Sequence, residues 1–392
     1  LRETFIQSFL ELQERCKVEA SSLRYDYQIP EQFPLLQAFN LEKSLSLNEL
    51  EALNAELDAF NALNIVPCIE EALAEQRTEL VIRNLELTRI PEALFAVPEY
   101  QDFWHNLKRL DCSSNSLIYL PESIDRLQVL RELMCSQNQL QSLPESIGRL
   151  QDLEFLGCMT NQLQSLPERI GGLRALQQLI CSDNALKSLP ESIDKLKALK
   201  IIYCNHNELQ SLPEGIGGMQ ALESLHCNHN ELQSLPESIG GLQALRYLGC
   251  GHNKLQSLPE SIGRLQTLES LHCDHNELQF LPESIGGLRA LRFLYCDHNQ
   301  LQSLPESIGS LQALMGLSCG NNQLQSLPET LKRRFGYRWA SDTLRIQRQT
   351  YPERDFPTTW LPSFTQQRAQ RGSTLQDVSE LERIRYDFCS LL

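Results

Sequence analysis

Hydrophobic residues recur at fixed spacing along most of the chain, and the segment 271–291, LHCDHNELQFLPESIGGLRAL, shows the pattern. Leu271 and Cys273 alternate with polar residues, which is typical of a short strand with one buried face. After a proline, Ile285 and Leu288 follow at wider spacing in the return half of the segment. The pattern predicts a coil made of a strand, a turn and a return segment, with the apolar side chains inside.

This segment repeats every 23 residues, and an asparagine marks the turn in each copy. These asparagines are Asn115, Asn138, Asn161, Asn184, Asn207, Asn230, Asn253, Asn276, Asn299 and Asn322. Because an Asn side chain both donates and accepts hydrogen bonds, we expect each one to satisfy backbone groups that stacking buries at the turn. One coil cannot bury its own leucines, whereas stacked coils bury a continuous core and align their strands in a parallel sheet.

The repeat L-x-C-x-x-N-x-L-x-x-L-P, continued by L-P-x-x-I-G-x-L, resembles the leucine-rich-repeat family in its 23-residue form. The resemblance implies an α/β leucine-rich-repeat solenoid, or horseshoe, with a parallel β-sheet on its concave face. It also implies a binding scaffold and not an enzyme, and we find no motif for a nucleophile or a phosphate loop. The string LQSLPESIG recurs almost verbatim, which indicates recent internal duplication. A residue that recurs in every coil can therefore result from duplication rather than from selection for a function.

The repeat divides the chain into three parts. Residues 1–79 predict either a helical N-terminal cap or a small module with its own partner. Residues 80–328 predict a solenoid of about 11 coils, and its first coil is degenerate because Leu85 stands in place of the asparagine. Residues 329–392 predict a helical or irregular C-terminal cap and a tail that ends in CSLL.

Helix signals are present before the first coil. Ser46 and Glu49 form a capping box, which predicts that a helix begins there. Pro67 is placed to open a further helix that runs through Arg77. We therefore expect two separate helices between residues 46 and 77.

Charge and cysteine content narrow the class of protein. The net charge of −15 argues against nucleic-acid binding, which needs a basic face. Of the 13 cysteines, ten form one column at a strand position that faces the core: Cys112, Cys135, Cys158, Cys181, Cys204, Cys227, Cys250, Cys273, Cys296 and Cys319. Neighbouring thiols on in-register strands point the same way, so we expect no disulfide framework. Unpaired thiols suit a reducing cytosol, and we see no signal peptide and no long apolar run.

Two rows of variable residues flank the buried leucine of each strand and predict the binding surface. They diverge while the rest of the repeat stays constant, and they include aromatic side chains, which anchor many protein interfaces. The candidates for partner contact on the concave face are Phe155, Tyr203, His226, Tyr247, His272, Phe293 and Tyr295. Gly249 is expected to leave a hollow between His226 and His272.

A second set of histidines precedes the turn asparagine in five consecutive coils: His206, His229, His252, His275 and His298. Three interpretations stay open. The histidines are copies whose imidazoles hydrogen-bond along the column, or a pH-sensitive surface that gains charge near pH 6, or metal ligands. Candidate ligands are His226, His229, His272 and His275, but Cys273 points inward while its polar neighbours point outward. We therefore expect no metal and no cofactor.

The last four residues, Cys389 to Leu392, match the C-a-a-X pattern in which a final leucine specifies geranylgeranylation of the cysteine. Lipidated Cys389 would make a host geranylgeranyltransferase a partner and would hold the protein peripherally on host membranes. Together with near-identical repeats that resemble bacterial leucine-rich-repeat proteins, this predicts an effector that binds a host protein in the host cytoplasm. The competing hypotheses are a eukaryotic-type leucine-rich-repeat adaptor of small GTPase pathways and a His-rich metal or pH sensor.

Overall fold

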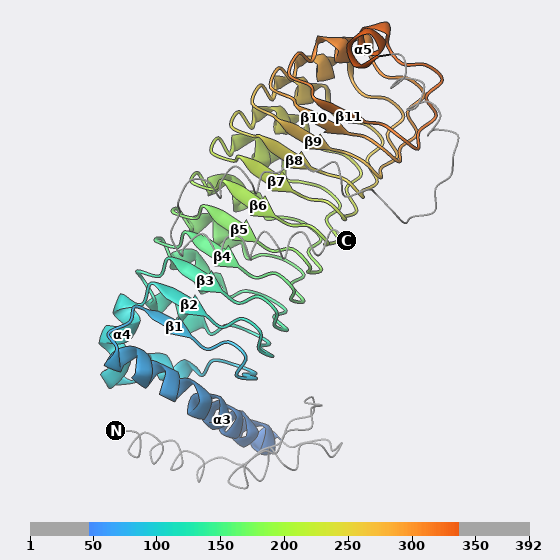
Figure 1. Ribbon diagram of the computed structural model, residues 1–392. Helices are drawn as coiled ribbons and strands as arrows, with labels where there is room; N and C mark the ends of the chain where they lie inside the picture. Colours follow the sequence, from blue (N-terminus) through green and yellow to red (C-terminus); the bar gives the residue numbers. More distant parts are fainter. Residues whose placement is uncertain (1–46, 337–392) are drawn as a thin grey trace. The chain divides into compact units, whose positions relative to one another are not determined.

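The computed structural model describes residues 47–336, with side chains from Asp58 onward. Within this range eleven strands form one parallel sheet whose spatial order is the sequence order, β1 to β11. Figure 1 shows the coils stacked one after another, each contributing one strand. The predicted solenoid with a parallel sheet is confirmed.

Each coil has a three-residue strand and, on its return half, a short 3-10 helix. The strands are β1 Glu79–Val81, β2 Arg109–Asp111, β3 Glu132–Met134, β4 Phe155–Gly157, β5 Gln178–Ile180, β6 Ile201–Tyr203, β7 Ser224–His226, β8 Tyr247–Gly249, β9 Ser270–His272, β10 Phe293–Tyr295 and β11 Gly316–Ser318. The 3-10 helices are η1 Glu92–Ala96, η2 Pro98–Tyr100, η3 Glu122–Arg126, η4 Glu145–Arg149, η5 Glu168–Gly172, η6 Glu191–Lys195, η7 Glu214–Gly218, η8 Glu237–Gly241, η9 Glu260–Arg264, η10 Glu283–Gly287 and η11 Glu306–Ser310. The α-helices are α3 Leu47–Ala74, α4 Gln101–Asn106 and α5 Glu329–Phe335.

The strand register places equivalent residues of every coil side by side. Leu225 at the centre of β7 pairs with Leu248 at the centre of β8, and both are fully buried. Side chains alternate across a strand, so the first and third strand residues lie on the opposite side of the sheet. We call that side the strand face.

The asparagines join each coil to the one before it. The Asn230 amide nitrogen donates to the carbonyls of Cys204 in the preceding coil at 3.0 Å and of Cys227 in its own coil at 3.1 Å. Its oxygen accepts the N–H of Leu209 in the preceding coil at 3.0 Å. In the degenerate first coil, where Leu85 replaces the asparagine, Asn115 of the next coil accepts the N–H of Leu85 at 3.0 Å. The predicted role of these residues is confirmed.

The cysteine column lies in the core, as predicted. Its ten thiols are at most 1% exposed, and no cysteine of the described part of the chain is in a disulfide. The Cys227 thiol donates to the carbonyl of Gly249 in the next coil at 3.0 Å. Burial raises the pKa of this thiol to about 12, so it stays protonated and unreactive near neutral pH.

On the return side, the coils touch through their backbones. A Cβ added to Gly240 in η8 would lie 2.5 Å from the carbonyl oxygen of Ser261 in η9, so only glycine fits there. Glu237, at the start of η8, accepts the N–H of Ser261 at 3.2 Å. A carboxylate from one coil therefore caps the 3-10 helix of the next, where backbone N–H groups are unpaired.

The prediction of two helices before the first coil is wrong. α3 is one helix of 28 residues, and Pro67 lies inside it. Ile65 and Ile69, on either side of the proline, are fully buried in the same core as the first coil, whereas Pro67 is exposed. Packing on both sides therefore outweighs the backbone hydrogen bond that proline cannot make.

The two ends of the described stack are covered by polar contacts. Asn61 of α3 donates to the Thr88 hydroxyl at 3.1 Å and accepts the Thr88 N–H at 2.9 Å. At the other end, the Arg334 guanidinium of α5 donates to the carbonyls of Leu311 and, at 2.7 Å, of Leu314. Whether residues 1–79 form a cap or an independent module stays a prediction, because residues 1–46 lie outside the described part.

We expect Asn230→Ala to lower the free energy of unfolding by about 3 kcal/mol, because it leaves several buried backbone groups unpaired at about 1–3 kcal/mol each. Urea unfolding followed by circular dichroism measures the change. Gln233→Ala is the matched control, because this side chain of the same coil is exposed. A loss for Asn230→Ala no larger than for Gln233→Ala would show that the asparagines do not hold the stack together.

Candidate functional site

Five aromatic rings from five adjacent strands stack across the strand face. They belong to Tyr203, His226, Tyr247, His272 and Tyr295, and we call them the aromatic ladder. Successive ring centroids are 4.1, 4.2, 5.0 and 4.3 Å apart. Five of the seven predicted contact residues therefore form one continuous surface on β6 to β10.

The expected hollow at Gly249 is filled, so that prediction is wrong. A Cβ added there would lie 3.0 Å from Cε1 of Tyr247, the first residue of the same strand. The absence of a side chain at Gly249 lets the Tyr247 ring lie across β8. Tyr247 thereby occupies the gap between His226 and His272 and makes the ladder continuous.

The other two candidates lie outside the ladder. Phe155 was expected on the surface, but it is only 8% exposed, and its ring lies against Gly157 at the other end of β4. It is therefore a poor anchor for a partner. Phe293 is partly exposed and packs beside Gly316 of the next strand, where an added Cβ would lie 3.1 Å from its Cδ1.

Serines fix the orientation of both ladder histidines. Ser224 Oγ lies 2.8 Å from Nε2 of His226, and Ser270 Oγ lies 3.1 Å from Nε2 of His272. Burial lowers the pKa of His226 to about 3, and the nearby His272 adds to this shift. Burial likewise lowers the pKa of His272. Both rings are therefore neutral near pH 7 and the ladder carries no charge of its own.

A row of charged residues directly before the strands borders the ladder, and the sequence reasoning did not include it. Glu269 Oε1 lies 2.7 Å from the Arg246 guanidinium, and Glu269 Oε2 lies 3.7 Å from Arg292. Met315 continues this row, is 61% exposed, and its sulfur lies 3.5 Å from Arg292. The sequence does indicate this row, because the residues at these positions vary between coils as those of the two strand rows do.

The histidines that precede the turn asparagines also stack, and we call them the histidine column: His206, His229, His252, His275 and His298. Their ring centroids are 3.9 to 4.2 Å apart with planes 10° to 14° from parallel. The imidazoles meet one another by face-to-face stacking, and the expected hydrogen bonding along the column is seen at its end, where Nε2 of His298 lies 2.7 Å from the amide nitrogen of Asn321. Burial and neighbouring histidines lower the pKa of His229 to about 4, so this ring stays neutral near pH 6 and weakens the interpretation of the column as a pH-sensitive surface.

The four predicted metal ligands do not come together. His226 and His272 belong to the aromatic ladder, and His229 is separated from His275 by His252 in the histidine column. Within residues 47–336, the group with potential ligand atoms close together is His252, Asp274 and His275. Cys273 is fully buried, as expected.

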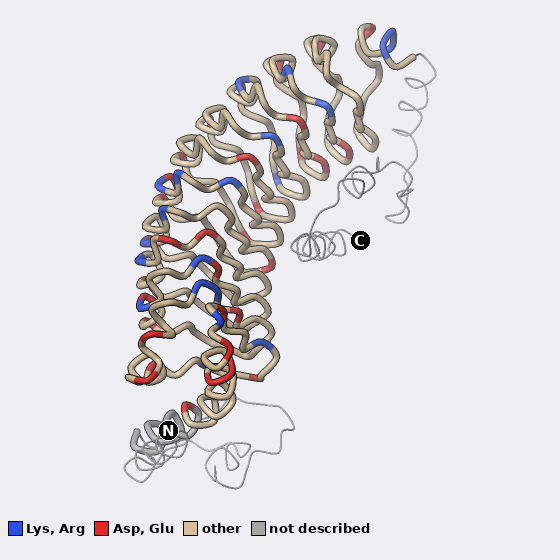
Figure 2. Tube along the Cα trace, turned by 60° about the vertical axis from the view of Figure 1, so that its left-hand side comes forward, with Lys and Arg blue, Asp and Glu red and all other residues tan. Residues whose placement is uncertain are grey.

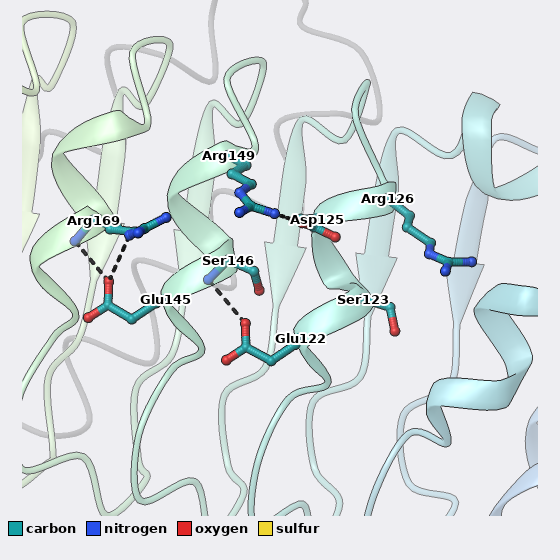
Figure 3. A pocket seen from close by; sticks show the side chains of 8 residues that line it. All are labelled: Glu122, Ser123, Asp125, Arg126, Glu145, Ser146, Arg149 and Arg169. Atoms are coloured by element: carbon teal, nitrogen blue, oxygen red, sulfur yellow. Dashed lines mark hydrogen bonds and ion pairs between the residues drawn. The ribbon is translucent and has the colours of Figure 1, made fainter.

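Charged side chains on the return side line a shallow hollow between η3, η4 and η5, and Figure 3 shows how they pair with one another. Arg149 lies 2.6 Å from Asp125, and Glu145 lies 3.9 Å from Arg169. Figure 2 shows the same mixing of basic and acidic residues along the described coils. The charges of this hollow are largely neutralised by their neighbours, so it is a weaker candidate for binding than the aromatic ladder.

The coil geometry agrees with sequence comparison. The family profile described as a leucine-rich repeat region matches residues 152–237 and 226–333. The described coils form a leucine-rich-repeat solenoid. No match was found among curated protein sequences.

Similar solved structures include both receptors and bacterial proteins. A TDR receptor is 26% identical with a TM-score of 0.57, and the match covers 72% of this chain and 48% of that one. The functional domain of InlJ from Listeria monocytogenes, which includes a cysteine ladder, is 22% identical with a TM-score of 0.55, and the match covers 68% and 57%. YopM from Yersinia pestis, a leucine-rich effector protein, is 28% identical with a TM-score of 0.48, and the match covers 69% and 79%. The chain thus spans about half of the first two proteins, and its own partner must be inferred from its own surface.

Two further predictions bear on membranes. Cys389 lies outside the described residues, so its lipidation stays a prediction from the sequence. Within residues 47–336, no helix combines the length and the apolar character that crossing a membrane requires.

We expect the protein to lose stability as the pH falls below about 6.5, because unfolded histidine has a pKa of about 6.5 and His226 in the fold has a pKa of about 3. The fold therefore binds fewer protons than the unfolded chain, and protonation favours unfolding over this pH range. At pH 5 His226 alone should cost about 2 kcal/mol relative to pH 7.5. Urea midpoints at the two pH values measure the loss.

His226→Phe separates this effect from other acid-sensitive groups, because phenylalanine keeps an aromatic ring between Tyr203 and Tyr247 and does not titrate. His272 is the other titratable histidine in the ladder, and burial still lowers its pKa in this variant. Between pH 7.5 and pH 5 the variant should lose about 2 kcal/mol less stability than the native protein loses. An equal pH dependence in the variant and the native protein would contradict the assignment.

Proposed function

We propose that this protein is a non-enzymatic scaffold that binds a partner protein on the strand face, with the aromatic ladder as the anchor. The observation that carries the proposal is the stack of five rings on β6 to β10. Tyrosine supplies a large contact area at low conformational cost because it has only two side-chain torsions. The ladder rings are held in place before binding, so binding loses little side-chain entropy.

The chemistry of the ladder and its border defines the kind of partner. The ring faces are covered by neighbouring rings, so a ligand meets ring edges, the Tyr295 side chain (37% exposed) and the phenolic hydroxyl groups. Arg246, Glu269 and Arg292 add a mixed-charge border. We infer an extended peptide segment that lays apolar side chains along the ladder and polar groups toward this border.

A displayed library of random linear peptides tests the proposal without a known partner. Peptides enriched on the native protein should bind the double variant Tyr203→Ala/Tyr295→Ala at least about tenfold more weakly, as expected when hot-spot aromatic residues are truncated. The two substitutions lie at the ends of the ladder, so the inner rings keep their packing.

Two controls locate the effect. Tyr119→Ala removes a tyrosine that is 41% exposed outside the strands, and Ile180→Ala changes the strand face on β5. Neither should weaken the enriched peptides as strongly as the ladder variant. Peptides that bind the ladder variant as tightly as the native protein would refute the proposed surface.

Within this function, we propose that the partner is a host protein met in a reducing host cytosol. The near-identical repeats and the unpaired cysteine column support this form of the proposal. This form of the proposal predicts that a bacterium encodes the chain and that a reporter fusion expressed there reaches the cytosol of cultured host cells. Retention of the fusion in the bacterium, together with ladder-dependent binding to small GTPases, would favour the eukaryotic-type adaptor instead.

A further inference from the structure

Asp274 departs from the pattern of its row, which consists of the residues directly after the buried cysteines. In this row Asn205 Oδ1 accepts the N–H of Asn228 at 2.9 Å, Asn228 Oδ1 accepts that of Gly251 at 2.8 Å, and Asp297 Oδ1 accepts that of Gly320 at 2.7 Å. Within the described coils, Asp274 makes no such bond to the next coil. Its Oδ2 lies 3.1 Å from Nδ1 of His275 instead.

Gly251 in the preceding coil provides the room for this carboxylate. A Cβ added to Gly251 would lie 3.0 Å from Oδ1 of Asp274, which is closer than ordinary contact. Other coils nearby carry Asn228 and Asp297 at the position equivalent to Gly251. The glycine therefore occurs together with an aspartate that faces a histidine of its own coil and not the backbone of the next coil.

Two imidazoles complete the group. His252 and His275 stack with their ring centroids 3.9 Å apart, and one potential ligand atom from each of His252, Asp274 and His275 lies within 4.8 Å of the others. His252 is exposed and the other two are partly exposed, so an ion can reach them from solvent. Burial and neighbouring histidines lower the pKa of His252, which keeps its nitrogen lone pair free near pH 7.

We propose that His252, Asp274 and His275 form a binding site for a divalent first-row transition-metal ion. Two imidazoles and one carboxylate suit Zn²⁺, Ni²⁺ or Cu²⁺ and are a poor set for Ca²⁺ or Mg²⁺, which prefer oxygen ligands. Three protein ligands leave a coordination position for water or for a group from a bound partner.

Metal binding must break the parallel stacking of the His252 and His275 rings. Bonds of about 2.0–2.2 Å to zinc bring ligand atoms to about 3.3 Å from one another, so the three side chains must close in from their present spacing. Parallel imidazoles direct their lone pairs side by side, and one of the two rings must tilt to share an ion. Because these side chains are not fully buried, the rotation leaves the core unchanged.

Calorimetric titration of the full chain with Zn²⁺ tests the site, with His252→Gln, Asp274→Asn and His275→Gln as the diagnostic variants. We expect binding to the native protein that each variant weakens at least about tenfold, since even loss of outer-sphere partners has effects of that scale. Gly251→Ala should also weaken binding, although it removes no ligand, because its Cβ displaces the Asp274 carboxylate.

His206→Gln and Asp297→Asn are the matched controls, one from the same histidine column and one from the same row in the next coil. They should leave the tight Zn²⁺ binding unchanged, which separates the site from general binding by histidines or by cysteines elsewhere in the chain. Ring proton resonances of His252 and His275 should shift on addition of Zn²⁺ in the native protein. Absence of binding, or binding that the three diagnostic variants leave unaltered, would overturn the proposal.

Discussion

The hydrogen bonds of the turn asparagines are the interaction on which the rest of the structure depends. Each asparagine joins backbone groups of two successive coils, as Asn230 does with Cys204, Leu209 and Cys227. Coil stacking hides these groups from water, and burying them unpaired would be costly. The fixed period of 23 residues follows, because an inserted residue would move the amide away from its partners in the neighbouring coil.

A frame fixed this firmly leaves the strand face free to vary. The central aliphatic residue of each strand is committed to the core, and so is the cysteine that follows ten of the eleven described strands, whereas most first and third strand residues face away from the core. Tyrosine and histidine at these positions then meet across strands through the parallel register, as Tyr203 and His226 do. The same register stacks the histidines of the turns.

The repeat made much of the structure predictable from sequence. Its period fixed the register, so the inward cysteines, the asparagine bonds and the membership of the two strand rows could be deduced. The side-chain conformations could not, because they depend on contacts across strands. Tyr247 turns over Gly249 and Phe155 turns over Gly157, which closed an expected hollow in one strand and buried an expected anchor in the other. The helix start predicted at Pro67 is absent for a related reason, since the packing of Ile65 and Ile69 outweighs the tendency of proline to begin a helix.

The metal site and the aromatic ladder illustrate two ways in which a copied repeat acquires a distinct local surface. In the ladder, Gly249 lets the Tyr247 ring lie across its own strand. At the metal site, Gly251 makes room for the Asp274 carboxylate. In both cases the neighbouring coils keep the frame intact. Function on such a scaffold is therefore expected where a few coils differ from their copies.

The most direct test of the central claim is a crystal structure of the protein with a peptide that it selects. The account predicts that the peptide lies on the strand face and contacts the rings of Tyr203, Tyr247 and Tyr295, with the asparagine bonds unchanged. A peptide bound on the side of the 3-10 helices, with the aromatic ladder uncovered, would contradict it.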